Sequence, residues 1–434
     1  MFLKKIVLAL MAFIVFSLPG GIGGFGGVSL GGFGLLSMIG ILAFLAAVAF
    51  LLFGRRGLGQ APVPWDPSLT LFGAFVVLNF ASVGWAGNTS AAINSATTYA
   101  QLLVFIWLLL FLRSEKSAFS ILLHAYLLGA FVVLVQTASV YGFSGLLELN
   151  SRLAGAGRTA NGFAFVLVLA MPIAFYLFQQ GSTRLRWLYL AYVPAAGFLV
   201  FLSASRTGFV LMVAVLLVGF LSLIRVEHRG RLRISTKAVA FSVVIAVAMA
   251  ILIAPQLSGQ FQRQVDRIAT VTQDETAGGR VHLWVSAIRV YLDNPILGVG
   301  SGGARTATAE YRAPEGLIVS LEARRIAPHN TYLGIAVETG TFGLLLYLAA
   351  LGMVVLRLPN LPRNDRLMFF SMVGVTLIAA TTLSLESRRE FYFALFLPLA
   401  VAALSPQNRR THRPGALRPP ERVKPHVTAG IRNR

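Results

Sequence analysis

The chain has 434 residues, of which 56% are hydrophobic and only 12% are charged, and its mean hydropathy is +0.74. This composition excludes a soluble globular domain, and apolar stretches of about 20 residues, the length that crosses a bilayer, recur along the chain. A membrane β-barrel would instead show alternating segments of about ten residues. The sequence therefore predicts an all-α polytopic membrane protein.

The positive charge lies between the apolar stretches and at the C-terminus. The formal net charge is +21, but the basic residues form short clusters, as orientation signals do, rather than one surface for nucleic acid. Cysteine is absent, which excludes disulfides, thiolate chemistry and Cys-ligated metals. We therefore expect membrane lipids, and no nucleic acid, as partners.

Hydropathy predicts about twelve membrane spans. In chain order they are Leu3–Leu18, Leu35–Phe53, Leu69–Trp85, Tyr99–Leu112, Phe119–Tyr141, Ala160–Phe178, Trp187–Ser203, Gly208–Ile224, Ala238–Ala254, Asn330–Leu356, Leu367–Leu383 and Phe391–Leu404. The first stretch has an alternative interpretation as a cleaved signal peptide, but Ser17–Gly20 lacks the small-x-small cleavage pattern. The sequence predicts that the chain divides into N-terminal helices (1–186), a core (187–356) with a long loop (255–329), the last helices (357–404) and a basic disordered tail (405–434).

Alternate connections between these spans are basic. The basic set comprises Lys4/Lys5, Arg55/Arg56, Arg113/Lys116, Arg184/Arg186, Arg225–Arg233, Arg357/Arg363/Arg366 and the tail from Arg409. Cytoplasmic connections carry an excess of Lys and Arg, so we predict that this set and both termini are cytoplasmic. The long segment Pro255–His329 is then on the outer side, together with Gly142–Thr159, Ser203–Thr207 and Ser384–Glu390.

Several arginines fall on this outer side, where the orientation rule does not explain them. Arg206 is the most specific, because Ser203–Gly208 joins two apolar helices with almost no connection and no carboxylate nearby in sequence. Such a guanidinium needs an anion or a polar cage, and its fork matches phosphate oxygens. The alternative is an arginine that extends to headgroups or helix carbonyls. Further substrate-binding candidates are Arg152, Arg158, Arg388 and Arg389.

An amphipathic helix is predicted within the long segment. Its apolar positions recur at helical spacing and are Val281, Trp284, Ile288 and Tyr291. Gly278–Gly279 precede this helix and Asp293–Pro295 ends it. The glycine-rich stretch that follows, Gly298–Gly303, is more typical of a turn or a close backbone approach than of a nucleotide site.

Arg280 is the second candidate cation. The predicted helix start places it in the first turn, where a positive charge opposes the helix dipole and so does not serve helix stability. A phosphate bound there would gain from the side chain and from free backbone amides. Pairing with Asp274 or Glu275 is the alternative.

His329 lies where the long segment re-enters a hydrophobic helix. Imidazole groups titrate near neutrality, so an external His329 at the water–lipid boundary is suited to proton transfer, although a capping role is the alternative. Asn330 either caps the next helix or holds the imidazole. Glu338 falls on roughly the opposite helix face. Only the fold can therefore supply a carboxylate partner, from Glu386 or Glu390.

Ordered motifs between about residues 187 and 356 resemble the O-antigen ligase/polymerase superfamily. They are Ser203-x-Ser205-Arg206-Thr207-Gly208, Gly279-Arg280-x-x-Leu283-Trp284, Asn294-Pro295-x-Leu297-Gly298-x-Gly300, and His329-Asn330-x-Tyr332-Leu333 with Glu338-x-Gly340. The size, the number of spans and the one large late loop look most like the ligase itself. One departure is that neither Arg206 nor Arg280 begins the Arg-x-x-x-Leu element that some ligases carry.

The resemblance implies a GT-C-like glycosyltransferase with its active site on the periplasmic face of a Gram-negative inner membrane. The donor would be O-antigen on undecaprenyl diphosphate and the acceptor lipid A–core oligosaccharide. Arg206 and Arg280 would bind the diphosphate, His329 would be the base for the acceptor hydroxyl, and Asn330 would help to bind substrate. Direct attack would invert the anomeric centre. No metal, ATP or other cofactor is expected.

Three other functions share parts of this pattern. An O-antigen polymerase or a protein O-oligosaccharyltransferase of the same superfamily would use similar residues with another acceptor. The protein-modifying relatives usually carry further sequence after the conserved region, and the polymerases diverge more around the histidine. A transporter of polyprenyl-linked glycans would show mid-membrane charges and repeated halves. Here the charges gather at the predicted outer edge, which favours an enzyme.

Overall fold

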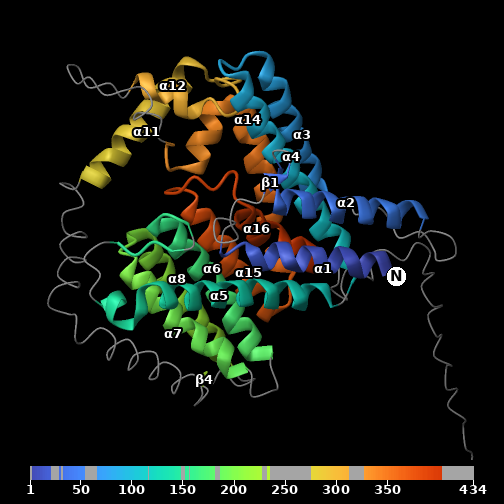
Figure 1. Cartoon of the computed structure of the whole chain (residues 1–434), viewed down its shortest axis with the longest axis vertical. Helices are drawn as coiled ribbons and strands as arrows, with labels where there is room; N and C mark the ends of the chain where they lie inside the picture. Colours follow the sequence, from blue (N-terminus) through green and yellow to red (C-terminus); the bar gives the residue numbers. More distant parts are fainter. Residues whose placement is uncertain are drawn as a thin grey trace, which may run out of the picture.

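The computed structural model describes residues 2–20, 29–30, 33–53, 66–115, 117–147, 152–155, 157–180, 186–226, 232–234, 275–311 and 327–402. Within these ranges the chain is almost entirely helical (Figure 1). The predicted span Ala238–Ala254 and the tail at 405–434 lie outside the described residues. Each of the other predicted spans coincides with a described helix.

The elements follow the order expected from hydropathy. The helices are α1 (Phe2–Ser17), α2 (Leu35–Phe53), α3 (Pro67–Ala81), α4 (Thr89–Phe111), α5 (Ala118–Leu147), α6 (Ala160–Gln180), α7 (Arg186–Leu202), α8 (Arg206–Leu223), α11 (Glu275–Asp293), α12 (Ala304–Glu310), α14 (Thr331–Val355), α15 (Arg363–Ala379) and α16 (Arg389–Ala402). Single 3-10 turns are η2 (Ser82–Gly84), η3 (Leu112–Ser114) and η6 (Leu358–Asn360). Two short antiparallel pairs join β1 (Ser29–Leu30) to β2 (Phe33–Gly34) and β3 (Ile224–Val226) to β4 (Leu232–Ile234).

Six helical segments in the described part of the chain are long and apolar enough to cross a membrane. They are α2, α3 with η2, α4, α5, α6, and α14 with η6. Helices α7 and α8 are apolar but shorter. The chain is thus a polytopic helical membrane protein, while the number of twelve spans and the GT-C architecture stay predictions.

Helices α6 and α16 lie at the centre of the bundle (Figure 1). Helices that are apolar all round are buried all round, and every residue of Phe163–Ala174 in α6 and of Phe391–Leu397 in α16 is buried. Helix α6 packs on α5, α7, α8 and α15, and α16 packs on α4, α14 and α15. The ring of Tyr126 on α5 stacks on Phe393 of α16 with centroids 5.2 Å apart.

Helix α14 is interrupted at Gly340, whose φ of 63° is left-handed and open to glycine at little cost. Backbone hydrogen bonds of 2.8 to 3.0 Å join Pro295, Val299 and Gly300 to the residues on either side of this break. A Cβ on Gly340 would lie 2.2 Å from the Ile296 carbonyl oxygen. The close backbone approach predicted for the glycine-rich stretch is therefore confirmed. Its hydrogen bonds satisfy backbone groups of α14 on both sides of the interruption.

Buried polar side chains fix the same loop to α3. The Ser301 hydroxyl donates to Asn79 Oδ1 at 2.7 Å, and the Ser301 amide donates to the Ser82 hydroxyl at 2.9 Å. All three side chains are buried. The Glu338 carboxylate accepts hydrogen bonds from the Gly302 and Ala304 amides. The segment that follows α11 is thus held between α3 and α14, which sets the position of α11.

Candidate active site

Arg206 is the first residue of α8. Ser205 caps this helix, because its hydroxyl oxygen accepts from the Gly208 amide at 3.1 Å. A Cβ on Gly208 would lie 2.5 Å from Ala164 Cβ, so the glycine of this motif allows α8 to lie against α6. A cation at a helix N-terminus opposes the helix dipole. Arg206 therefore does not serve the stability of α8.

Arg152 reaches the same turn from the loop before α6. The Leu153 amide donates to the Leu202 carbonyl at 3.2 Å. Arg152 Nε lies 3.4 Å from the Ser203 carbonyl oxygen, and its Nη2 donates to Asn161 Oδ1 at 2.8 Å. The side chain is exposed. Arg152 thus remains a substrate-binding candidate beside the turn that precedes α8.

Helix α11 differs from its prediction in start and register. It begins at Glu275, so Arg280 lies in the second turn and the predicted first-turn position is wrong. The backbone amides beside Arg280 are therefore not the free amides of a helix N-terminus. The buried residues of α11 include Ala287 and Val290, whereas Val281 and Ile288 of the predicted stripe are exposed. The predicted end at Asp293 is confirmed.

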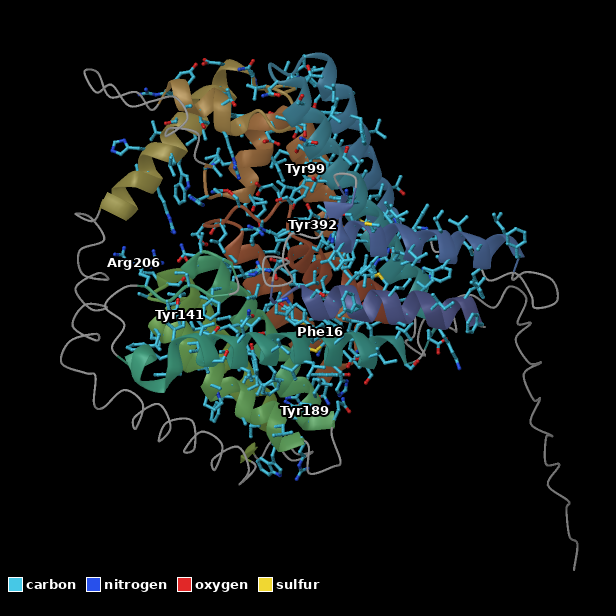
Figure 2. The ribbon with its side chains drawn as sticks, in the orientation of Figure 1. Phe16, Tyr99, Tyr141, Tyr189, Arg206 and Tyr392 are labelled. Atoms are coloured by element: carbon cyan, nitrogen blue, oxygen red, sulfur yellow. The ribbon has the colours of Figure 1, made fainter. Side chains whose placement is uncertain are left out.

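Arg280 and Arg206 form a concentration of positive charge. Burial lowers the pKa of Arg280, and the charge of Arg206 lowers it further. A guanidinium nevertheless stays protonated in proteins. Figure 2 shows Arg206 at the start of α8, on the side of the bundle that faces α11. An anion bound between two such groups relieves their repulsion and accepts charge-assisted hydrogen bonds.

Trp284 connects α11 to the segment that carries His329. It lies four residues after Arg280 and so on the same face of the helix. Its indole Nε1 donates to the Pro328 carbonyl at 3.1 Å. His329, the next residue, is half-buried. The face of α11 that carries Arg280 therefore lies against the turn of His329.

The turn of His329 has an unusual backbone. Its φ is 52°, and the other described non-glycine residue with positive φ is Ala204, at 49°, in the turn before Arg206. Such conformations cost on the order of 1–3 kcal/mol and cluster at functional sites. Asn330 Oδ1 accepts from the Leu333 amide at 3.1 Å, so the prediction that Asn330 caps the next helix is confirmed.

The turn between α15 and α16 contacts both candidate regions. The hydroxyl oxygens of Thr207 and Thr382 are 3.2 Å apart. Thr331 forms hydrogen bonds of 2.8 to 2.9 Å with the backbone of the same turn. Arg206 precedes Thr207 directly, and His329 lies two residues before Thr331. The fold therefore places two of the three predicted catalytic residues, Arg206 and His329, next to residues that contact one turn.

Glu386 is the carboxylate on this turn. Its side chain lies close to Thr331, and its Oε2 is buried and has no hydrogen-bond partner among the described residues. Burial raises the pKa of Glu386. Two acids were proposed as partners of His329. Glu390 is paired with Arg158, so Glu386, which lies near the start of α14, is the candidate that remains.

The raised pKa of Glu386 predicts a pH-dependent cost in stability. The protonated form is favoured in the fold, so the contribution of Glu386 is intact below the ordinary carboxyl pKa of 4.5. It is lost as the pH rises through the raised value. We expect the melting temperature of Glu386→Gln, relative to that of the unmutated protein, to increase from pH 4.5 upward. A difference that stays constant with pH contradicts the prediction.

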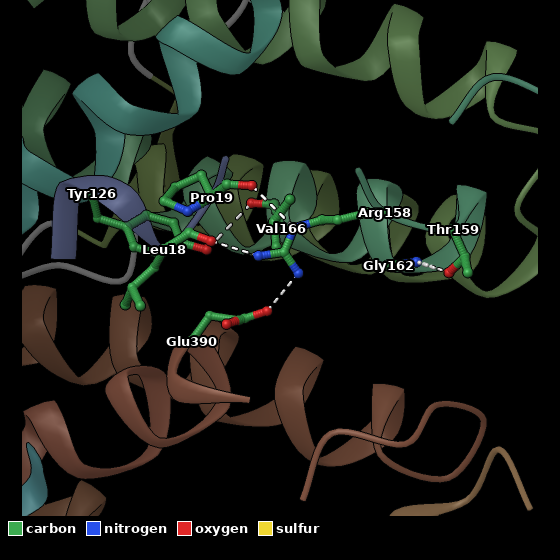
Figure 3. Close-up of polar contacts among 8 residues, drawn as sticks. All are labelled: Leu18, Pro19, Tyr126, Arg158, Thr159, Gly162, Val166 and Glu390. Carbon is green, nitrogen blue, oxygen red and sulfur yellow. Dashed lines mark hydrogen bonds and ion pairs between the residues drawn. The ribbon is translucent and has the colours of Figure 1, made fainter. Parts of the chain in front are cut away.

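Arg158 lies inside the bundle (Figure 3). Its Nη1 forms an ion pair with Glu390 Oε1 at 2.6 Å, and the side chains are 8% and 5% exposed. Its Nη2 and Nε donate to the carbonyls of Leu18 and Pro19 at 2.6 and 3.1 Å. These contacts join α1, α6 and α16. The structure thus shows structural contacts for Arg158, and its substrate binding stays a prediction.

Arg388 and Arg389 lie at the start of α16. Arg389 Nη2 donates to Ser37 Oγ at 3.2 Å and to Gln101 Oε1 at 3.1 Å, whereas Arg388 is exposed. Both line a cleft of about 200 Å³, so both remain substrate-binding candidates. In the described part of the chain, no group of three His, Asp or Glu residues is arranged to hold a metal ion.

Several contributors to this site were missed in the sequence. Trp284 was assigned to the apolar stripe and to a motif but not to a hydrogen bond, although its indole N–H requires a partner when it is buried. Thr382 is 175 residues from Thr207, and no local signal points to their contact. The left-handed Ala204 was missed for a similar reason, because alanine rarely adopts such a backbone.

Comparison with known proteins supports the motif-based recognition. Residues 190–348 match the family model described as O-antigen ligase. This range contains Arg206, Arg280 and His329, which the fold brings toward one turn. Curated proteins give no match to the chain. Residues 190–348 thus form an O-antigen ligase family domain, which confirms the family that the motifs indicate.

Proposed function

We propose that the protein is an O-antigen ligase. It transfers O-antigen from undecaprenyl diphosphate to lipid A–core oligosaccharide at the periplasmic face of a Gram-negative inner membrane. The family domain supports the class of enzyme, and the apolar helices support lipid-linked substrates. The observation that carries the proposal is the common position of Arg206, Arg280 and His329, tied together through Trp284 and the turn before α16.

The reaction is a direct displacement at the anomeric carbon of the donor. The acceptor hydroxyl gives its proton to His329 as its oxygen forms the new glycosidic bond. The bond between that carbon and the diphosphate oxygen breaks on the opposite side, so the configuration inverts. The electron pair leaves with the diphosphate. The imidazolium then returns its proton to solvent.

The arginines stabilise the charge that develops on the leaving group. Two guanidinium groups that repel each other gain stabilisation when a diphosphate binds between them, and they gain more as its charge grows. The half-buried environment of Arg280 strengthens this interaction because less water screens it. Both side chains are attached to helices, which keeps their positions fixed during transfer.

The test uses purified protein, lipid-linked O-antigen and lipid A–core, without ATP or added metal. We expect Arg206→Ala and Arg280→Ala each to lower the transfer rate by about 10² to 10³-fold, as loss of one charge-stabilising donor does. Arg289→Ala is the matched control, because Arg289 is exposed and lies nine residues along α11, on the opposite helix face.

Product analysis decides between the related activities. Glycan attached to lipid A–core supports the ligase. Longer lipid-linked chains formed without that acceptor would identify a polymerase instead. Rates of both arginine variants that equal the rate of Arg289→Ala would remove the arginines from the proposed site.

A further inference from the structure

We propose that the cleft beside Arg389 and the apolar groove next to it form an entry site for the isoprenoid phosphate lipid that carries the donor glycan. Its phosphate would lie at Arg388 and Arg389, and its chain would lie between α2 and α4. This inference rests on the proposed function for the identity of the lipid, and on the geometry of the cleft and groove for its place.

The cleft has an excess of positive charge. It has a volume of about 200 Å³, and its charged lining residues are Arg158, Arg388, Arg389 and Glu390. The ion pair at 2.6 Å between Arg158 and Glu390 neutralises both of these groups. Arg389 contacts the neutral Ser37 and Gln101. Two guanidinium groups thus remain to bind an anion with phosphate geometry.

The groove beside this cleft is apolar. It has a volume of about 230 Å³ and shares Leu36, Gln101 and Arg389 with the cleft, so the two adjoin at Arg389. Its other lining residues are mostly hydrophobic and include Ile41 and Val104. One charged cleft that adjoins one apolar groove suits a lipid that carries a single hydrocarbon chain on its phosphate. A diacyl lipid has two chains, and the groove offers a place for one of them.

The groove is accessible from the bilayer. Ile41 is 47% exposed, and its neighbours Leu42 and Leu45 on α2 are also exposed. Helix α2 is a candidate membrane span in which few residues are buried. In the predicted orientation, the end of α1 and the starts of α2 and α16 lie in the outer half of the membrane. A lipid of the outer leaflet can therefore enter from the side.

The mouth of the groove is connected to the candidate active site. Arg388 and Arg389 follow the turn on which the Leu385 amide donates to the Thr331 hydroxyl oxygen at 2.8 Å. Thr331 in turn lies two residues after His329. A lipid phosphate at Arg389 therefore lies beside the turn that contacts Thr207 and Thr331, the neighbours in sequence of Arg206 and His329.

Gly40 offers a way to block the groove without disturbing the fold. It lines the groove, and a Cβ built on it would meet no atom within 4 Å. Gly352 on α14 also has open space around its Cβ position and lies outside the groove. Gly40→Leu and Gly352→Leu are thus a matched pair that makes the same change in two helices. Arg389→Gln tests the mouth separately.

The experiment measures binding of undecaprenyl phosphate to the full chain in phosphatidylcholine nanodiscs. We expect Gly40→Leu and Arg389→Gln each to weaken binding by about tenfold or more, while Gly352→Leu stays within about twofold of the unmutated protein. Equal affinities for the two glycine variants would overturn the proposal. Displacement of the probe by inorganic phosphate, or by phosphatidylglycerol as effectively as by unlabelled probe, would overturn the isoprenoid assignment.

The binding assay tests the groove and the transfer assay tests the proposed base, so either proposal can be contradicted without the other. His329→Ala is expected to bind undecaprenyl phosphate like the unmutated protein while it forms no product. If His329→Ala forms product at the full rate, the proposed base is wrong, and the comparison of Gly40→Leu with Gly352→Leu still decides the groove.

Discussion

Replacement of His329 by alanine is expected to lower the rate of glycan transfer by about 10² to 10⁴-fold, the range that a positioned general base contributes. The base must take the proton of the acceptor hydroxyl, and alanine has no group that can do so. The measurement is the initial rate of product formation from lipid-linked O-antigen and lipid A–core, at saturating concentrations of both.

The left-handed backbone of His329 requires a matched variant. Its φ is 52°, and alanine in that conformation costs roughly 1–2 kcal/mol, whereas asparagine adopts it readily. His329→Asn should therefore melt close to the temperature of the unmutated protein and still be inactive. His329→Ala should be inactive and somewhat less stable. Full activity in His329→Asn would exclude proton transfer by this side chain.

Glu390→Ala is expected to destabilise the protein by about 3–5 kcal/mol, because it leaves Arg158 as an uncompensated buried charge. The two side chains are 8% and 5% exposed, and their ion pair of 2.6 Å joins the start of α16 to the loop before α6. The measurement is the melting temperature in detergent, together with the fraction of protein that remains monodisperse.

A double variant separates lost charge compensation from lost packing. Arg158→Met combined with Glu390→Leu removes both charges and keeps side-chain volume, and such exchanges are often neutral or stabilising. We expect it to recover most of the stability lost in Glu390→Ala. Arg388→Ala, two residues away and exposed, is the control and should change little. A melting temperature for Glu390→Ala equal to that of Arg388→Ala contradicts the structural role of the pair.

The helices of the bundle could be predicted because their signal is local. Runs of about 20 apolar residues are sufficient to indicate a span, and each predicted span in the described part of the chain is helical. The start of α11 could not be predicted from the same rules. Two consecutive glycines cost about 1 kcal/mol each in a helix, but packing of α11 on α12 and α14 outweighs this cost.

The sequence predicted which residues form the candidate site, but it predicted their contacts in the fold only in part. The motifs identify Arg206, Arg280 and His329, since each lies in an unusual local context. The ion pair of Arg158 could not be predicted because its partner Glu390 is 232 residues away, and no periodicity reveals such a contact. An arginine on the outer side has the same sequence signature whether it binds a substrate or a buried carboxylate.

The interruption of α14 at Gly340 has a mechanical consequence. Because backbone hydrogen bonds attach residues 295–300 on both sides of the break, both halves of α14 are tied to the segment that follows α11. We therefore expect the histidine and the cation on α11 to keep their positions relative to each other when a large saccharide binds. Their separation is then conserved for acceptors of different bulk.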